Sequence, residues 1–174
     1  MDESRFWAMI ETAWGTVGGK ATSRHRLADG KLSEGRALAL EEVLDGEVAP
    51  ALREQLDALP ADELLAFDRI LERKLYDIDR EDIHERTDGS DDGFLYCRGF
   101  IVGMGRAYYE AVLADPDRAV CDAACEEMCY LSWHLHHDKF GEVPPSGICR
   151  ETQSNDAGWA SDAEPGAAAD GGGM

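Results

Sequence analysis

Residues 61–78 read ADELLAFDRILERKLYDI and decide the fold, because their large apolar side chains recur every three or four positions. At that spacing they share one face of an α-helix. Charged side chains fill the opposite face, and Pro60 precedes the run. The stretch therefore predicts an amphipathic helix that buries one face against other helices. The members of that face are Leu64, Phe67, Leu71, Leu75 and Ile78.

The same periodicity predicts more helices on both sides of this one, and no convincing pair of strands appears. We read residues 18–31 as a linker and Asp45-Gly46 as a break between two short helices. Gly99 and Gly103, one turn apart, predict a close approach by another part of the core. The predicted fold class is all-α, a compact single-domain bundle of about five to six helices. Besides 61–78, the predicted helices cover residues 4–17 (with Ser4 as N-cap), 33–44, 49–59, 91–114 and 117–137.

The composition changes near residue 150. Residues 1–149 carry the helical pattern, whereas residues 150–174 consist mainly of Gly, Ala, Asp and Ser, with almost no large apolar side chains except Trp159. Such a segment cannot bury enough apolar surface to offset its ordering entropy. We therefore predict one helical domain over residues 1–149 and a disordered acidic tail over residues 150–174.

The chain is strongly acidic, with 36 Asp and Glu against 17 Lys and Arg and a formal charge of −19 in 174 residues. Nucleic acids and anionic membranes are disfavoured as partners, because both are bound through a surplus of Lys and Arg. The N-terminus, MDES, lacks the basic start of a secretory signal. Five cysteines lack the spacing of a secreted disulfide scaffold, so we expect a cytoplasmic protein with reduced thiols.

Several stretches together resemble a bacterial family, the domain of unknown function 4240. They are residues 5–10 (RFWAMI), 66–71 (AFDRIL), 90–100 (SDDGFLYCRGF) and 105–117, so the resemblance spans roughly residues 4–135. It implies a small, mainly helical domain and no established reaction. The chain departs from the family in the acidic stretch 76–84. Its row of cysteines is also a departure.

That row, Cys121, Cys125 and Cys129, recurs every four positions, and His136 follows on the same predicted helix. Two thiolates one helical turn apart can share zinc or another transition metal, with Cys97 or Cys149 as further ligands. Small cysteines also fill contacts between helices. Packing is the favoured interpretation, and a metal site at Cys125, Cys129 and His136 and thiol redox chemistry are the alternatives.

The loop before residue 91 and the motifs of the resemblance supply the candidate ligand-binding residues. Carboxylates at the start of a helix act as caps, and they also bind cations or amines. A buried pair, Asp68–Arg98 or Asp92–Arg106, is the structural alternative to a ligand pocket. The candidates are Asp68, Asp91, Asp92, Tyr96, Arg98 and Arg106.

Two functional hypotheses follow. Residues 62–92 hold 12 acidic and 5 basic side chains, a net charge of −7, and phosphate loops, nucleophile elbows and zinc-protease motifs are absent. The first hypothesis is a helical binding or accessory protein that docks a basic protein or peptide through an acidic face. The second is an enzyme, or a metal-assisted accessory to one, acting on a small cationic or peptide substrate through Cys125, Cys129, His136 and the Asp91/Asp92 loop.

Overall fold

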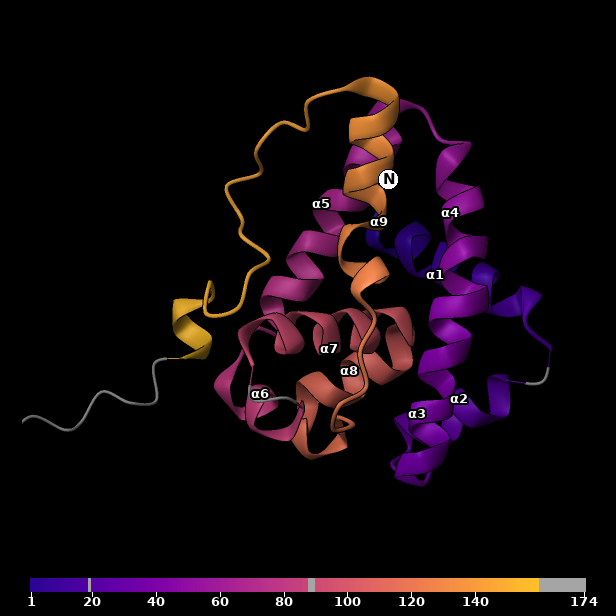
Figure 1. Ribbon diagram of the computed structural model, residues 1–174, viewed down its shortest axis with the longest axis vertical. Coiled ribbons are helices and arrows are strands. Elements are labelled where there is room, and N and C mark those ends of the chain that lie inside the picture. The colour runs from indigo at the N-terminus through magenta and orange to yellow at the C-terminus, as the bar shows by residue number, and fades with distance from the viewer. Residues whose placement is uncertain (19, 88–89, 160–174) are drawn as a thin grey trace, which may run out of the picture.

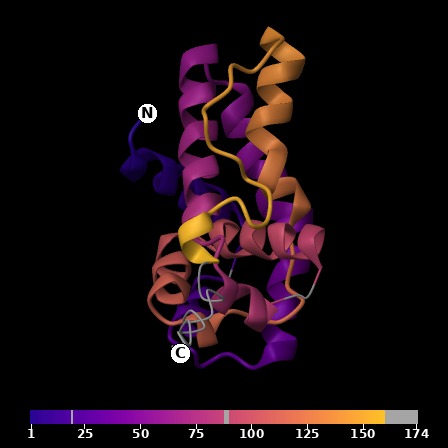
Figure 2. The same ribbon diagram turned by 90° about the vertical axis from the view of Figure 1, so that its left-hand side faces the viewer.

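The computed structural model describes residues 1–18, 20–87 and 90–159, and every regular element in these ranges is helical. The central pair is α5 (Ala61–Asp77) and α9 (Glu126–Phe140), which stand side by side along the long axis (Figures 1 and 2). α4 (Ala49–Asp57) packs against α9, and α7 (Asp91–Gly103) crosses beneath the pair. The all-α prediction is confirmed. None of the described helices combines the length and apolarity needed to cross a membrane.

Helix α5 forms as its sequence predicts. Its apolar stripe is fully buried, and α7 and α9 cover it. The stripe also carries Asp68 and Glu72 into the interior, where each requires a partner because a buried charge is costly without one. This helix therefore supplies both the centre of the core and its main buried acids.

The structure contains more helices than the five to six expected. Residues 18–31 are not a plain linker, because α2 (Ala21–Ala28) lies within them. α1 (Glu3–Thr16) is capped by Asp2 rather than Ser4, since Asp2 Oδ1 accepts the Arg5 N–H at 2.8 Å. The two short helices are α3 (Glu34–Val43) and α4, and a π-helical turn, η1 (Leu44–Val48), joins them where a break was expected.

The single helix expected over residues 91–114 is two helices, α7 and α8 (Arg106–Ala114). Gly105 separates them with φ of +92°, which favours glycine. The Met104 carbonyl beside it accepts from the Arg24 guanidinium instead of continuing a helix. Ser90 is the N-cap of α7, and its hydroxyl accepts the Gly93 N–H at 3.0 Å.

The helix expected over residues 117–137 is wrong over residues 117–125. A short 3₁₀ turn, η2 (Pro116–Arg118), and an irregular segment come first, and α9 begins only at Glu126. Cys125 is extended at φ −154°, and its N–H donates to the Tyr96 carbonyl of α7 at 2.9 Å. Cys121, Cys125 and Cys129 therefore do not form a row on one helix.

The chain does not leave the fold at residue 150. After α9 comes a segment that we call the strap, residues 141–159. It runs back along α5 and α9 toward α7, and its last residues include a 3₁₀ turn, η3 (Asp156–Gly158) (Figure 2). Arg150 is buried and Trp159 is half-buried, so the predicted disorder is wrong for residues 150–159. The remainder of the predicted tail, residues 160–174, lies outside the described residues. α6 (Glu81–Thr87) lies below α7 and packs against α7 and η2.

Candidate functional site

A buried ionic cluster lies where α5, α9 and the strap meet. Asp68 is fully buried and accepts the Ser132 hydroxyl at 2.9 Å. Arg150 places its Nη2 at 3.3 Å from both oxygens of Asp68 and 3.0 Å from Glu72 Oε1. Burial alone would raise the pKa of Glu72, but hydrogen bonds from Ser146 and Arg150 outweigh it and lower that pKa. The cluster therefore favours the ionised form of Glu72 inside the protein.

Arg98 lies in the same buried region but does not form an ion pair with Asp68. It is fully buried and donates to the carbonyls of Leu75 and Arg150, each at 2.9 Å. Its nearest described carboxylate is Asp79, with Nη1 at 3.9 Å from Oδ1. Burial lowers the pKa of Arg98, and Asp79 opposes that effect. The predicted Asp68–Arg98 pair is therefore wrong, because Arg150 takes the place beside Asp68.

The mouth of the ionic cluster is a groove beside α9 of about 470 Å³, which we call the α9 groove. Arg150 and Glu72 line it together with two aromatic side chains, Tyr130 and Trp133. Trp133 is 36% exposed and stacks on His137, with ring centroids 5.3 Å apart. The complete lining is Glu72, Glu126, Tyr130, Trp133, His134, Ile148, Cys149, Arg150 and Glu151.

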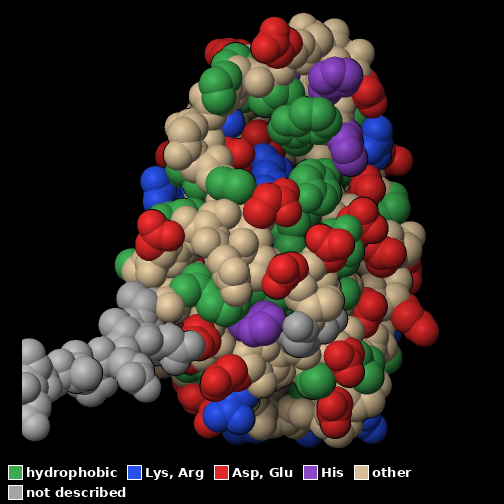
Figure 3. Space-filling view, turned by 60° about the vertical axis from the view of Figure 1, so that its left-hand side comes forward, with side chains coloured by type: hydrophobic (Ala, Val, Ile, Leu, Met, Phe, Trp, Pro, Cys, Tyr) green, Lys and Arg blue, Asp and Glu red, His purple; other side chains and the backbone are tan. Residues whose placement is uncertain are grey.

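Carboxylates concentrate at one end of this groove. A smaller hollow of about 240 Å³ shares Glu126, Tyr130 and His134 with it and adds Asp45 and Glu127. Next to it, burial and then the neighbouring acids, Asp45 among them, raise the pKa of Glu41. Figure 3 shows a face on which Asp and Glu side chains outnumber Lys and Arg and border hydrophobic and His side chains. Burial is the larger cause of this rise in the pKa of Glu41, and the charges of Asp45, Glu42 and Asp122 add to it because several carboxylates lie close together here.

Tyr96 connects the predicted residues to this acidic end. Its hydroxyl hydrogen-bonds with Glu126, and partial burial followed by the charges of Glu126 and Asp92 raises its pKa. Asp91 and Asp92 are exposed at the start of α7, where carboxylates stabilise the helix dipole. The Asp91 carbonyl also accepts the Thr152 hydroxyl of the strap at 2.6 Å.

Arg106 lies apart from the other candidates. It is exposed on α8 and pairs with Glu110, Nε to Oε1 at 2.6 Å, so the predicted Asp92–Arg106 pair does not form. It lines another hollow, of about 440 Å³, between α1, α2 and α8. The structure thus joins Asp68, Arg98 and Asp91 around the strap, and it places Tyr96 beside Glu126 of the groove, whereas Asp92 does not line the groove.

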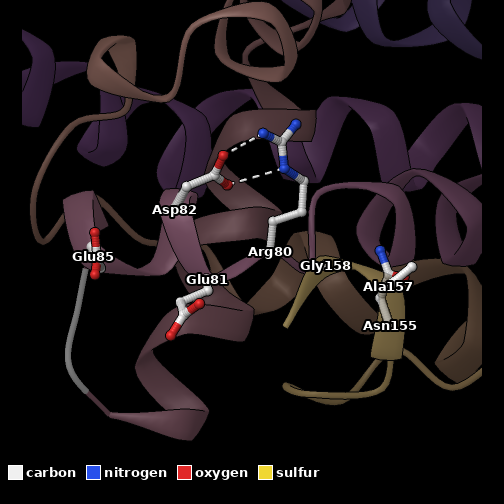
Figure 4. A pocket seen from close by; sticks show the side chains of 7 residues that line it. All are labelled: Arg80, Glu81, Asp82, Glu85, Asn155, Ala157 and Gly158. Atoms are coloured by element: carbon white, nitrogen blue, oxygen red, sulfur yellow. Dashed lines mark hydrogen bonds and ion pairs between the residues drawn. The ribbon is translucent and has the colours of Figure 1, made fainter. Parts of the chain in front are cut away.

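The acidic stretch 62–92 contributes less free charge than its composition suggests. Asp68 and Asp79 are fully buried, and Asp82 pairs with Arg80. Figure 4 shows that pair in a hollow of about 520 Å³ between α6 and η3, with Glu81 and Glu85 nearby. Arg80 also donates to the Leu113 carbonyl at 3.1 Å. Much of the acidity that sequence assigned to a docking face therefore serves internal contacts.

The predicted metal ligands lie in separate surroundings. Cys125 Sγ lies 3.3 Å from Asp45 Oδ1, and Cys129 Sγ lies 3.3 Å from the Leu95 carbonyl. Burial raises the pKa of both thiols, that of Cys129 to about 12, which keeps them protonated at neutral pH. His136 is buried against Phe140. Across the described ranges, no three His, Cys, Asp or Glu side chains are placed to hold a metal ion.

Sequence reasoning missed Glu72, Ser132 and Arg150. A usable signal existed for Glu72, which lies four positions after Asp68 on the buried side of α5. No local signal existed for Arg150, because its partners Asp68 and Glu72 are 82 and 78 positions away in sequence.

These features define a class: an all-helical protein whose core is closed by an arginine held between buried carboxylates. The chain belongs to the DUF4240 family, a protein family of unknown function, whose model matches residues 1–135. The predicted resemblance is thereby confirmed. Comparison with curated proteins and with solved structures gives no match. The family match includes the four core residues that contact the strap or lie beside those contacts, namely Asp68, Glu72, Asp79 and Arg98. The strap itself falls outside the match.

Proposed function

We propose that this protein is a small cytoplasmic binding or accessory protein that docks a basic segment of a partner protein in the α9 groove. One observation carries the proposal: the same groove combines crowded carboxylates with accessible aromatic rings. Lys and Arg side chains are recognised by such a combination. Carboxylates attract the cation, and aromatic faces contact it by cation–π interaction.

The groove has suitable chemistry along its length. Glu126 and Asp45 supply negative charge at one end, and Glu151 lies 3.3 Å from the Tyr130 hydroxyl in the middle. Trp133 offers an exposed ring at the other side. Crowded acids repel one another, so a bound cation relieves a repulsion already present in the free protein. Their charge would also speed the approach of a basic partner.

Calorimetric titration with a short synthetic peptide rich in Arg and Gly tests the proposal, with a peptide bearing Glu in place of each Arg as reference. We expect binding of the basic peptide alone, weakening as NaCl rises because exposed charges are screened. The double variant Asp45→Asn/Glu126→Gln should bind at least about tenfold more weakly, equal to about 1.4 kcal/mol.

The matched control is Glu85→Gln/Glu110→Gln, which removes the same charge from exposed positions on α6 and α8, outside the groove. It should leave the affinity within about twofold of wild type, since only the general field changes. Equal losses in both double variants would show a diffuse attraction to an acidic surface and contradict a groove-specific site. Absence of binding by wild type would refute the proposal.

A further inference from the structure

The strap is fixed to the helical core mainly through polar contacts. Arg150 is the only buried residue of the strap, residues 141–159. Apart from η3 it forms no helix, and it follows the junction of α5 and α9 down to α7 (Figure 2). A segment with little buried apolar surface opens at lower free energy than the core helices beneath it.

The first anchor is the Arg150 side chain. Its guanidinium lies between the carboxylates of Asp68 and Glu72, and Nη1 donates to the Cys129 carbonyl at 2.5 Å. The Tyr130 ring completes the surroundings, with its centroid 5.6 Å from the arginine Cζ. Carboxylates on one side, a carbonyl at the end and an aromatic face form a pocket suited to a guanidinium rather than to a compact ammonium.

The second anchor is Asp79, which holds the backbone of the strap. Its two oxygens accept the N–H groups of Gln153, Ser154 and Asn155 at 2.7–3.1 Å. The indole N–H of Trp159 adds a fourth bond at 3.0 Å. Three of these four donors are backbone groups, which every residue except proline supplies. The anchor therefore recognises a turn of the backbone, in which Gln153 has φ +64°, rather than particular side chains.

Arg98 connects the two anchors from below. It donates to the Arg150 carbonyl at 2.9 Å and lies 3.3 Å from the Thr152 hydroxyl. Asp68, Glu72, Asp79 and Arg98 thus present a continuous seat for a segment that turns at Gln153, with one pocket that selects arginine. All four seat residues belong to the part of the chain matched by the family model, and the segment occupying the seat does not.

We propose that the strap is a releasable internal ligand, and that the same seat accepts an arginine-bearing segment of a partner protein in its place. This inference rests on the proposed function, because the α9 groove opens onto Arg150 and gives the partner its route to the pocket. The partner's arginine takes the position of Arg150, its backbone N–H groups bind Asp79, and the strap comes away. The strap thereby competes with the partner.

The test uses the full chain carrying Arg150→Gln, which vacates the arginine pocket. The probe is a labelled peptide of residues 146–159 with Cys149 replaced by Ser, and anisotropy reports its binding. We expect the variant to bind this peptide at least about tenfold more tightly than wild type, whose own strap fills the seat. The same peptide with Gln or Lys in place of its Arg should bind the variant at least about tenfold more weakly.

Hydrogen exchange on the same variant supplies the second measurement. We expect exchange at residues 153–155 to accelerate much more than exchange in α5 and α9. An equal loss of protection in α5, α9 and the strap would show that the strap is part of the cooperative core and would overturn the inference. Equal affinity of variant and wild type for the peptide, or equal binding of the Arg and Gln peptides, would also overturn it.

The outcomes separate this inference from the proposed function. The strap peptide carries one Arg against Glu151 and Asp156, so its side chains sum to −1 and acidic surfaces do not attract it. Binding of that peptide to the variant would support the seat even if wild type bound no Arg-rich peptide. Conversely, salt-sensitive binding of Arg-rich peptides by wild type would stand if the strap peptide failed to bind.

Discussion

At the scale of single residues, the fold depends on a few fully buried charges whose partners come from distant positions. Asp79 and Arg98 have no exposed surface. Asp68 has none either, and its partner Arg150 is also buried. A buried pair adds little net stability when intact, yet removal of one member leaves the other charged and unpaired. Such positions should respond to substitution far more strongly than exposed acids of the same type.

Asp79→Asn should lower the free energy of unfolding by about 3 kcal/mol, because Arg98 loses its nearest carboxylate and the strap loses charged acceptors. Urea denaturation measures this loss. Asp156→Asn, an exposed position on the same strap, should change stability by no more than about 0.5 kcal/mol. Similar losses in the two variants would show that Asp79 does not anchor the strap.

Glu41→Gln should stabilise the protein at neutral pH. Burial and the neighbouring acids raise the pKa of Glu41 above 4.5, so its ionised form costs folding free energy. The cost is present above the folded-state pKa and declines as pH falls through it. Melting temperatures across pH should therefore show a gain at pH 7 that disappears below the ordinary value of 4.5. A gain that persists in acid would assign the effect to packing instead.

At the scale of helices, the crossing of α7 over the start of α9 sets how closely the layers pack. A Cβ on Gly99 would lie 2.4 Å from the Cys125 carbonyl oxygen and 2.6 Å from Cys129 Sγ. The close approach predicted from Gly99 and Gly103 is present, with the Leu44 side chain over Gly103. Cys125 and Cys129 are therefore part of a helix contact, and their small size suits it.

Gly99→Ala should destabilise the protein by about 2–3 kcal/mol, because backbone on the other side of the contact cannot move aside as a flexible side chain does. The control is Gly35→Ala on α3, where nothing lies within 4 Å of the added Cβ. That substitution should gain about 0.5–1 kcal/mol through helix propensity. Thermal unfolding of both variants distinguishes packing at Gly99 from a general effect of replacing glycine.

Helix types were more predictable than helix ends. The α5 stripe and the Ser90 cap are local patterns, and the structure contains both. The break at Gly105 depends on Arg24 reaching the Met104 carbonyl 80 positions away, and the late start of α9 depends on Cys125 bonding to Tyr96. Contacts between distant segments decided these ends, so periodicity alone could not place them.

At the scale of the whole molecule, the acidic side chains that give the net charge of −19 differ in their surroundings. Sequence reasoning placed the functional acidity at residues 62–92, but several of those acids lie inside the core or in ion pairs. The crowded surface acids belong instead to η1 and the start of α9, which are distant in sequence and adjacent in space. Asp68, Tyr96 and Arg98 were identified through family motifs, whereas the groove required the fold.

Moderate salt should therefore raise the melting temperature by a few degrees. Raising NaCl from about 0.01 M to about 0.15 M shortens the screening length from about 30 Å to about 8 Å, which weakens repulsion across an acidic molecule. KCl at the same ionic strength should act equally if screening is the cause. A melting temperature that falls with salt would show that surface ion pairs outweigh the repulsion.

The distance in sequence between Arg150 and its acids also bears on how the protein is made. During synthesis, Arg150 leaves the ribosome 82 residues after Asp68. The helices can therefore pack together while Asp68 and Glu72 still lack the guanidinium of Arg150. A nascent or broken chain that stops after α9 leaves Asp68 without the Arg150 guanidinium and Glu72 with Arg69 as its remaining cation, and is correspondingly easier for proteases to open. Closure by the strap thus distinguishes finished molecules from unfinished ones, and cellular quality control can act on that difference.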